Sequence, residues 1–382
     1  MGDITQALRT AQSGLLVNQQ TLNVVSNNVA NLNTVGYSRK IVRTESRVVA
    51  GVGAGVQISD ITRLVDEGLL KSLRLEFSDL NALTSQRDYY ARTQDLFGTP
   101  ADNTSLAHLT QSFQSALELL TVSPDKSLEQ SEVIRRAQDL ILMLQDMSST
   151  IQELRLQADN AISENVSEIN KIVQTIDQLN DEIISNGSVG RDVSDLRDDR
   201  DAQLDRLSEL VDIRYFYRND GDVVVFTSGG RTLVDTVPPT VTHVPAASVS
   251  PTTTKAEGDF AGIYVGNVEA RNDITSELRG GQLKGLVDLR DIVLVNLQSQ
   301  IDEFSAELRD TFNQIHNRGV SFPGAQSYEG TRNFIRPAEQ TIKLDPSSTA
   351  DDVAIVLFSS TGDQTAQTTL NTIMTGGGFS NH

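Results

Sequence analysis

The sequence has no cysteine and no tryptophan, and only four of its 382 residues are histidine. Without cysteine, the chain forms no disulfide, offers no thiolate to a metal and has no cysteine nucleophile. The histidines are spread along the chain, so a histidine metal site would need distant segments to converge. They are His108, His243, His316 and His382. We therefore expect no metal, no cofactor and no enzymatic activity, because no nucleophile, base and acid occur in a catalytic pattern.

Long apolar runs are also missing. No stretch approaches the roughly 18 apolar residues that span a membrane, and the N-terminus lacks the basic and apolar segments of a cleaved signal peptide. We expect no membrane partner. The pattern fits a cytoplasmic protein and equally a protein exported by a route that cleaves no signal.

Positive charge is in short supply. The chain has 32 Lys and Arg against 51 Asp and Glu, which gives a net charge of −19. This charge argues against nucleic acid or an anionic membrane as the partner. The first 58 residues differ, because five basic and two acidic side chains give them +3 and leave −22 for the remainder.

The clearest feature that is present is a heptad pattern near the N-terminus. Two interleaved series each repeat every seven residues between positions 4 and 32, and together they predict a helix with one narrow seam. The seam consists of Ile4, Leu8, Ala11, Leu15, Asn18, Leu22, Val25, Val29 and Leu32. Such a helix either packs within its own domain or needs a partner, in this chain or in a neighbouring copy.

The segment SNNVANLNTVGY, residues 26–37, ends this helix. Asn31 and Asn33 tolerate a left-handed backbone and Gly36 accepts a positive φ, so the segment predicts a bend. Beyond it we expect short extended segments. The run GVGAGV at 51–56 lacks the spacing of a dinucleotide-binding loop and is interpreted as a glycine-rich strand or bend.

Helical periodicity dominates the middle of the chain. A pattern from about Leu128 to Ile184 would extend on the order of 85 Å as one helix. A helix of that length indicates a coiled coil or an elongated bundle. We expect a loop at 185–190 and another helix at 192–211, whose charged cluster is interpreted as a solvated, salt-bridged face. The cluster comprises Asp195, Asp198, Asp199 and Asp201 with Arg197 and Arg200.

The pattern then changes to period two. Residues 213–235 predict three strands joined by an Asp-Gly turn and a Gly-Gly turn. The run NDGD at 219–222 is interpreted as a hairpin turn and not as a calcium loop, because the later ligands are missing. A further strand is expected near 262–268, a helix at about 283–317, and strands at 341–345 and 353–358.

These patterns predict a mainly α fold with an inserted β domain. We expect an elongated, multi-domain protein in which a long-helix, coiled-coil-like bundle carries the small β domain. The expected divisions are an N-terminal assembly segment at 1–60, a helical bundle at 61–210 and 275–318, an inserted β domain at 211–274, and a partly β outer region with a flexible end at 319–382.

The N-terminal motif resembles the shared motif of the flagellar axial proteins, which are the rod, hook and hook-associated families. The matching residues are Ser26, Asn27, Asn28, Ala30, Asn31, Thr34, Gly36 and Tyr37. The resemblance implies that the heptad helix packs with a C-terminal helix in the inner tube of a filamentous assembly. No such helix is evident after residue 320, so the seam has no obvious partner inside the chain. We predict that residues 1–35 are loose in an isolated monomer.

Two later stretches, residues 196–235 and 277–320, are similar to segments of the first hook-associated family. This resemblance implies a structural, non-enzymatic component of the bacterial flagellum that forms the junction between hook and filament by ring-like or helical self-assembly. The implied partners are copies of itself, the hook protein, the next hook-associated protein or flagellin, and an export chaperone. The implied location is the extracellular flagellum, reached without a cleaved signal peptide. The alternative function is an adhesin or signalling coiled coil whose β domain binds a ligand.

Overall fold

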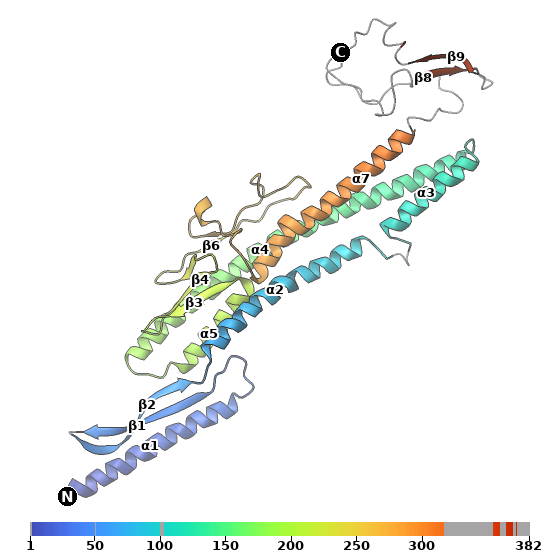
Figure 1. The fold of residues 1–382 in the computed structure, drawn as a ribbon. Coiled ribbons are helices and arrows are strands. Elements are labelled where there is room, and N and C mark those ends of the chain that lie inside the picture. Colours follow the sequence, from blue (N-terminus) through green and yellow to red (C-terminus); the bar gives the residue numbers. More distant parts are fainter. Residues whose placement is uncertain are drawn as a thin grey trace. The chain divides into compact units, whose positions relative to one another are not determined.

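The computed structural model describes residues 2–49, 51–99, 103–316, 354–359, 364–369 and 372. They are mainly helical with small antiparallel sheets, which confirms the predicted fold class. The helices are α1 Gly2–Ala30, α2 Glu67–Leu96, α3 Leu106–Val122, α4 Ser127–Ser188, α5 Ser194–Leu210, α6 Gly281–Asp288 and α7 Leu294–His316. Figure 1 shows these helices in chain order. None of them is long and apolar enough to cross a membrane, over the part of the chain that is described.

The strands pair as four small sheets, all antiparallel. They are β1 Lys40–Val49 with β2 Val52–Arg63; β3 Ile213–Tyr217, β4 Val223–Thr227 and β5 Thr232–Val234; β6 Val241–Thr242 with β7 Tyr264–Val265; and β8 Ala354–Phe358 with β9 Gln364–Thr369. The expected strands at 213–235 and at 353–358 are thus confirmed. The strand expected at 341–345 and the flexible end lie outside the described residues.

The chain divides into two compact units. One consists of Met1–Ser112 with Gln138–Ile301, and the other of Phe113–Ala137 with Asp302–His382. In the second unit, the rings of Phe113 in α3 and Phe312 in α7 lie 5.8 Å apart. The domain boundaries proposed from the sequence stay a prediction.

The core of the first unit is built on α4, which the sequence predicted over 128–184 and which extends to Ser188. The first four residues of the loop expected at 185–190 are therefore helical. The periodic apolar stripe of this helix, called the α4 seam below, faces inward, and Ile151, Ala158 and Ile176 on it are fully buried. Helix α5, the β3–β4–β5 sheet and α6 add their apolar side chains to the same core. The helices and the sheet therefore share one interior.

A buried polar network connects α4 to the loop after β6 and to the helical turn before α7. Asp159 in α4 accepts hydrogen bonds from the Ala246 main-chain N–H at 2.7 Å and from the Arg290 guanidinium at 2.6 Å, and its Oδ1 lies 3.0 Å from His243 Nε2. Arg155, one turn earlier, donates to the carbonyls of Arg290 and Thr253. Asp159 and Arg290 are thus buried as an ion pair, and the buried Arg155 guanidinium is hydrogen-bonded to carbonyl oxygens, so these buried charges are compensated or hydrogen-bonded.

Candidate assembly site

Helix α1 has two different long faces. One face lies against the β1–β2 hairpin, where Val24 is buried and Asn28 is half-buried. The other carries the predicted heptad seam, and every seam residue in α1 and the turn after it is exposed. Leu15 and Val29 are each 70% exposed. The described residues therefore provide no partner for the seam, although they do provide one for the opposite side of the helix.

Helix α1 and strand β2 approach each other closely where Ser13 lies against Gly55 and Val56. The Ser13 hydroxyl donates to the Thr10 carbonyl at 2.8 Å and accepts from the Val56 main-chain N–H at 3.1 Å. A Cβ on Gly55 would overlap the Ser13 side chain, and Gly55 has a φ of +112°. The GVGAGV run is thus a glycine-rich turn and strand, as interpreted from the sequence, and its last glycine makes room for α1.

Asn28 fixes the end of α1 to the start of β1. Its amide donates to the Lys40 carbonyl at 2.9 Å, and its Oδ1 accepts from the Lys40 main-chain N–H at 3.0 Å and from the Tyr37 hydroxyl at 3.0 Å. The Lys40 ammonium lies 4.6 Å from the centre of the Tyr37 ring. One motif asparagine therefore satisfies both main-chain groups of a strand residue twelve positions later.

The other motif residues shape the turn between them. The Asn31 amide donates to the Asn27 carbonyl at 3.1 Å, and the Thr34 hydroxyl donates to Asn31 Oδ1 at 3.1 Å. Gly36 has a φ of +84°, as predicted for a bend that needs a left-handed residue. Ser26 and Ala30 are exposed at the end of α1. The motif thus reverses the chain locally and makes no catalytic arrangement.

A buried charge cluster ties this segment to α5. Asp198 accepts from the Ser38 hydroxyl at 2.5 Å and from Arg63 at 2.9 Å, and Lys40 forms an ion pair with Asp195. Asp201 accepts from the same Arg63 guanidinium at 2.6 Å. Burial lowers the pKa of Arg63, but the two carboxylates outweigh this effect and raise it. The cluster therefore joins the hairpin to α5 through ion pairs.

Helix α2 joins the same cluster through Arg74. Its guanidinium donates to Asp205 at 2.6 Å and to Asp201 at 3.2 Å, while the Tyr217 hydroxyl donates to Asp201 at 3.1 Å. Burial and the Asp201 charge raise the pKa of Tyr217, so this tyrosine stays a hydrogen-bond donor. The hairpin, α2 and the β3 sheet thus converge on one face of α5.

This arrangement corrects one interpretation of the sequence. The charged residues of α5 were expected to form a solvated face, but Asp198, Arg200 and Asp201 are buried. Asp195 and Asp199 are exposed, as expected, although Asp195 pairs with Lys40. The physical reason is that cations from segments more than 120 residues away neutralise the carboxylates, which periodicity within one helix does not reveal. Lys40, Arg63 and Arg74 were missed for the same reason.

No group of three or more histidine, aspartate or glutamate residues is placed to hold a metal ion within the described part of the chain. The features available are therefore an unpartnered apolar seam, a motif that orients it and a charge cluster that anchors it. Such features suit assembly.

Comparison with known proteins first identifies the class. A family described as flagella basal body rod protein matches residues 8–37, which span the seam and the turn motif. The rod protein FlgG of Caulobacter vibrioides is 37% identical over 83 residues, 16% of this chain and 32% of its own length. The N-terminal segment is thus that of a flagellar axial protein.

The helical body then identifies the family. The family described as flagellar hook-associated protein FlgK helical domain matches residues 90–329, which is more than half of the chain, and the chain belongs to this family. It is accordingly a structural component of the extracellular bacterial flagellum, as the resemblance in its sequence implied.

Two relatives of known name agree with this assignment. Flagellar hook-associated protein 1 of Salmonella typhimurium is 27% identical over 393 residues, 97% of this chain and 69% of the relative. The protein of the same name from Bacillus subtilis is 24% identical over 97% of this chain and 80% of its own length. A solved structure of the flagellar hook junction protein FlgK from Burkholderia pseudomallei has 22% identity and a TM-score of 0.49, over 61% of this chain and 40% of that one.

Proposed function

We propose that this chain forms the junction between the hook and the filament by ring-like or helical self-assembly, with the α1 seam as the assembly element. The single observation that carries this proposal is the exposure of the whole seam on a helix whose opposite face is held by the β1–β2 hairpin. An alternative role as an adhesin or signalling coiled coil is not favoured, because the family is a flagellar one.

Energetics support burial of this seam in an assembly. Fully burying a leucine or valine side chain contributes roughly 1.5–3 kcal/mol relative to leaving it in water. Leu8, Leu15, Leu22 and Val29 are each at least 66% exposed and recur once per heptad. Asn18 within the seam is polar, and a single polar residue in a seam fixes the register of the partner helix at some cost in stability.

The proposed partners are further copies of this chain, the hook protein, and the next hook-associated protein or flagellin. An export chaperone is also proposed, since an exposed apolar stripe promotes association before assembly unless it is covered. Export to the flagellum without a cleaved signal peptide belongs to the same proposal. We propose no enzymatic activity for the chain.

The test begins with deletion of the gene, followed by electron microscopy of the cells and an assay of flagellin in the medium. We expect hooks without filaments and flagellin lost to the medium. Normal filaments on the deletion cells would overturn the junction role.

Complementation then tests the seam itself. A chain with Leu15→Asp should fail to restore filaments, because one charged residue interrupts the apolar stripe. Gln20→Asp, a charge added at an exposed position outside the seam, is the matched control and should restore them. Restoration by both variants would show that assembly does not use the seam.

A further inference from the structure

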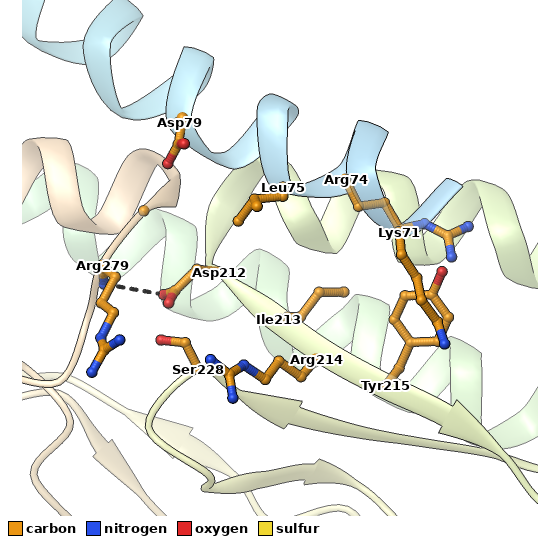
Figure 2. Close-up of a pocket in the computed structure, with 11 residues that line it drawn as sticks. Lys71, Arg74, Leu75, Asp79, Asp212, Ile213, Arg214, Tyr215, Ser228 and Arg279 are labelled. Atoms are coloured by element: carbon orange, nitrogen blue, oxygen red, sulfur yellow. Dashed lines mark hydrogen bonds between the residues drawn. The ribbon is translucent and has the colours of Figure 1, made fainter. Parts of the chain in front are cut away.

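A polar pocket of about 380 Å³ lies within the first unit, away from α1. Its walls come from α2, from the start of β3, from the turn after β4 and from the loop before α6. Figure 2 shows the Asp212 and Ser228 side chains together at the centre, with Asp79 on the α2 side and the Arg214 and Arg279 guanidinium groups at the opposite edge.

The base of the pocket contains polar groups that are not fully paired. Asp212 is buried, and its Oδ1 accepts from the Arg279 main-chain N–H at 3.3 Å. Burial raises the pKa of Asp212, and Ser228 lies close enough to the carboxylate to lower it in part. Asp212 Oδ2 and the Ser228 hydroxyl are nevertheless shielded from water and have no partner in a well-formed hydrogen bond among the described residues. Since buried polar groups are normally well paired, these two atoms leave room for a hydrogen-bonding group from outside the pocket.

The rim carries positive charge that the described part of the chain leaves uncompensated. Lys71, Arg214 and Arg279 are exposed pocket residues, and none forms an ion pair there. Arg74, which also lines the pocket, differs because Asp201 and Asp205 neutralise it. Asp79 is the one exposed carboxylate among the residues that line this pocket. In a chain with a net charge of −19, three unpaired cations around one opening form a distinct positive surface.

We propose that this pocket receives an acidic side chain from a second copy of the chain, with the carboxylate at the cationic rim and a neighbouring hydrogen-bonding group at Asp212 and Ser228. Guanidinium and ammonium groups form their strongest hydrogen bonds with carboxylates. The exposed side chain of Leu75 at the rim provides an apolar contact for the aliphatic part of the incoming residue.

A second copy is the occupant that the charge distribution favours. Beyond residue 58 the chain carries 22 more acidic than basic side chains, so each copy presents more carboxylates than cations. Complementary charge between copies also guides orientation and suppresses wrong contacts. This inference rests on the proposed self-assembly, but it concerns a surface separate from the α1 seam.

Carbodiimide coupling tests the contact directly, because it joins a lysine amine to a carboxylate only when the two are in contact. Isolated hook–filament complexes are treated, and dimers of the chain are resolved by size and identified by mass spectrometry. We expect a dimer in which Lys71 is joined to an aspartate or glutamate of the second copy. Lys71→Arg, which keeps the charge but removes the amine, should abolish it, and Lys126→Arg, at an exposed lysine elsewhere, should not.

Three outcomes would overturn the inference. Lys71 could couple to a hook or filament protein, couple only within its own chain, or fail to couple although junctions are intact in the microscope. None of these outcomes contradicts the proposed junction function. Normal filaments in the deletion cells would instead remove the function on which the inference rests.

Neutralising the rim gives an independent readout. In the double variant that combines Arg214→Gln with Arg279→Gln, the yield of the Lys71-linked dimer should fall by roughly tenfold. A tenfold fall corresponds to about 1.4 kcal/mol of lost affinity between the two copies. The matched control is Arg87→Gln with Arg92→Gln, which removes two exposed charges from α2 outside the pocket. An equal fall in both variants would point to general electrostatics and contradict a specific pocket.

Discussion

At the residue scale, the axial motif holds its bend with side chains that form the hydrogen bonds a neighbouring main chain would otherwise form. Asn28 presents a donor and an acceptor to Lys40, as a neighbouring strand would. Aspartate offers no donor, and glutamine would place its amide one carbon further away. The need for an asparagine at this position therefore follows from hydrogen-bond chemistry.

Replacing Asn28 with alanine should loosen the joint between α1 and β1. The substitution leaves the Lys40 N–H and the Tyr37 hydroxyl without their partner, at a cost of roughly 1–3 kcal/mol per buried group. Amide exchange at Lys40 should become faster by the corresponding factor. Asn33→Ala, at an exposed asparagine of the same motif, should leave that rate unchanged.

The contributions of two buried aspartates, Asp212 and Asp159, to folding stability should change with pH in opposite directions. Burial raises the pKa of Asp212 in the folded state, although the Ser228 hydroxyl and main-chain N–H groups, including those of Arg279 and Gly280, partly lower it. The folded chain therefore binds more protons at this site than the unfolded chain, so stability falls as pH rises above the ordinary value of 3.8. Asp212→Asn should raise the urea midpoint at pH 7, with a gain that shrinks towards pH 3.8. A lower midpoint at pH 7 would contradict this.

Asp159 is the second of these two buried aspartates, and its stability contribution depends on pH in the opposite direction. Burial raises its pKa, but hydrogen bonds from His243, the Ala246 N–H and Arg290 outweigh burial and hold it below the ordinary value. Its contribution is therefore present above pH 3.8 and lost as pH falls through the depressed pKa. Asp159→Asn should cost roughly 1.5–3 kcal/mol at pH 7, because the buried Arg290 guanidinium loses one of its two carboxylate partners and keeps only Asp291. Urea unfolding should show this loss at neutral pH and a smaller one in acid.

At the element scale, local periodicity predicted the elements that depend on it. The seam of α4 is buried almost as the sequence indicated, and the strands of the β3–β4–β5 sheet fall within the predicted stretch. Periodicity also located the α1 seam and left open whether it packs inside the chain. It did not reveal that α1 has a second face for the hairpin, because that face mixes Val24 with small and polar residues such as Ser13 and Asn28.

The small residue that decides this packing is Gly55. Alanine there would overlap Ser13 and would require a left-handed backbone that side chains disfavour. We expect Gly55→Ala to cost roughly 1–3 kcal/mol in the packing of α1 on β2. Exchange of the Val56 amide, which is bonded to Ser13, should report the loss. Gly53→Ala has open space around it and should leave the rate close to that of the wild-type chain.

At the scale of the whole molecule, the distribution of charge along the sequence does not show which charged residues pair in the structure. The N-terminal segment carries +3 and the rest of the chain −22, which by itself suggests loose electrostatic attraction. In the structure, Lys40 of this segment pairs with Asp198 of α5, and Arg63, which follows the segment in β2, pairs with Asp198 and Asp201. Arg63 lies 135 and 138 residues from its partners, so only the folded structure identifies them. The predicted looseness of residues 1–35 in an isolated monomer stays a prediction.

Asp201→Asn tests whether these pairs hold the assembly segment in place. The change removes the charge that Arg63 and Arg74 share, although Arg63 keeps Asp198 and Arg74 keeps Asp205. We expect a cost of roughly 1.5–3 kcal/mol, as for the loss of hydrogen bonds to a charged group. Amides of β1 and β2 should exchange faster, and filament number should fall although the α1 seam is intact. Asp199→Asn, at an exposed position of the same helix, should change neither. Equal acceleration along the α4 seam would mean that the segment and the body unfold as one unit. Faster hairpin exchange with normal filaments would mean that assembly itself supplies the orientation.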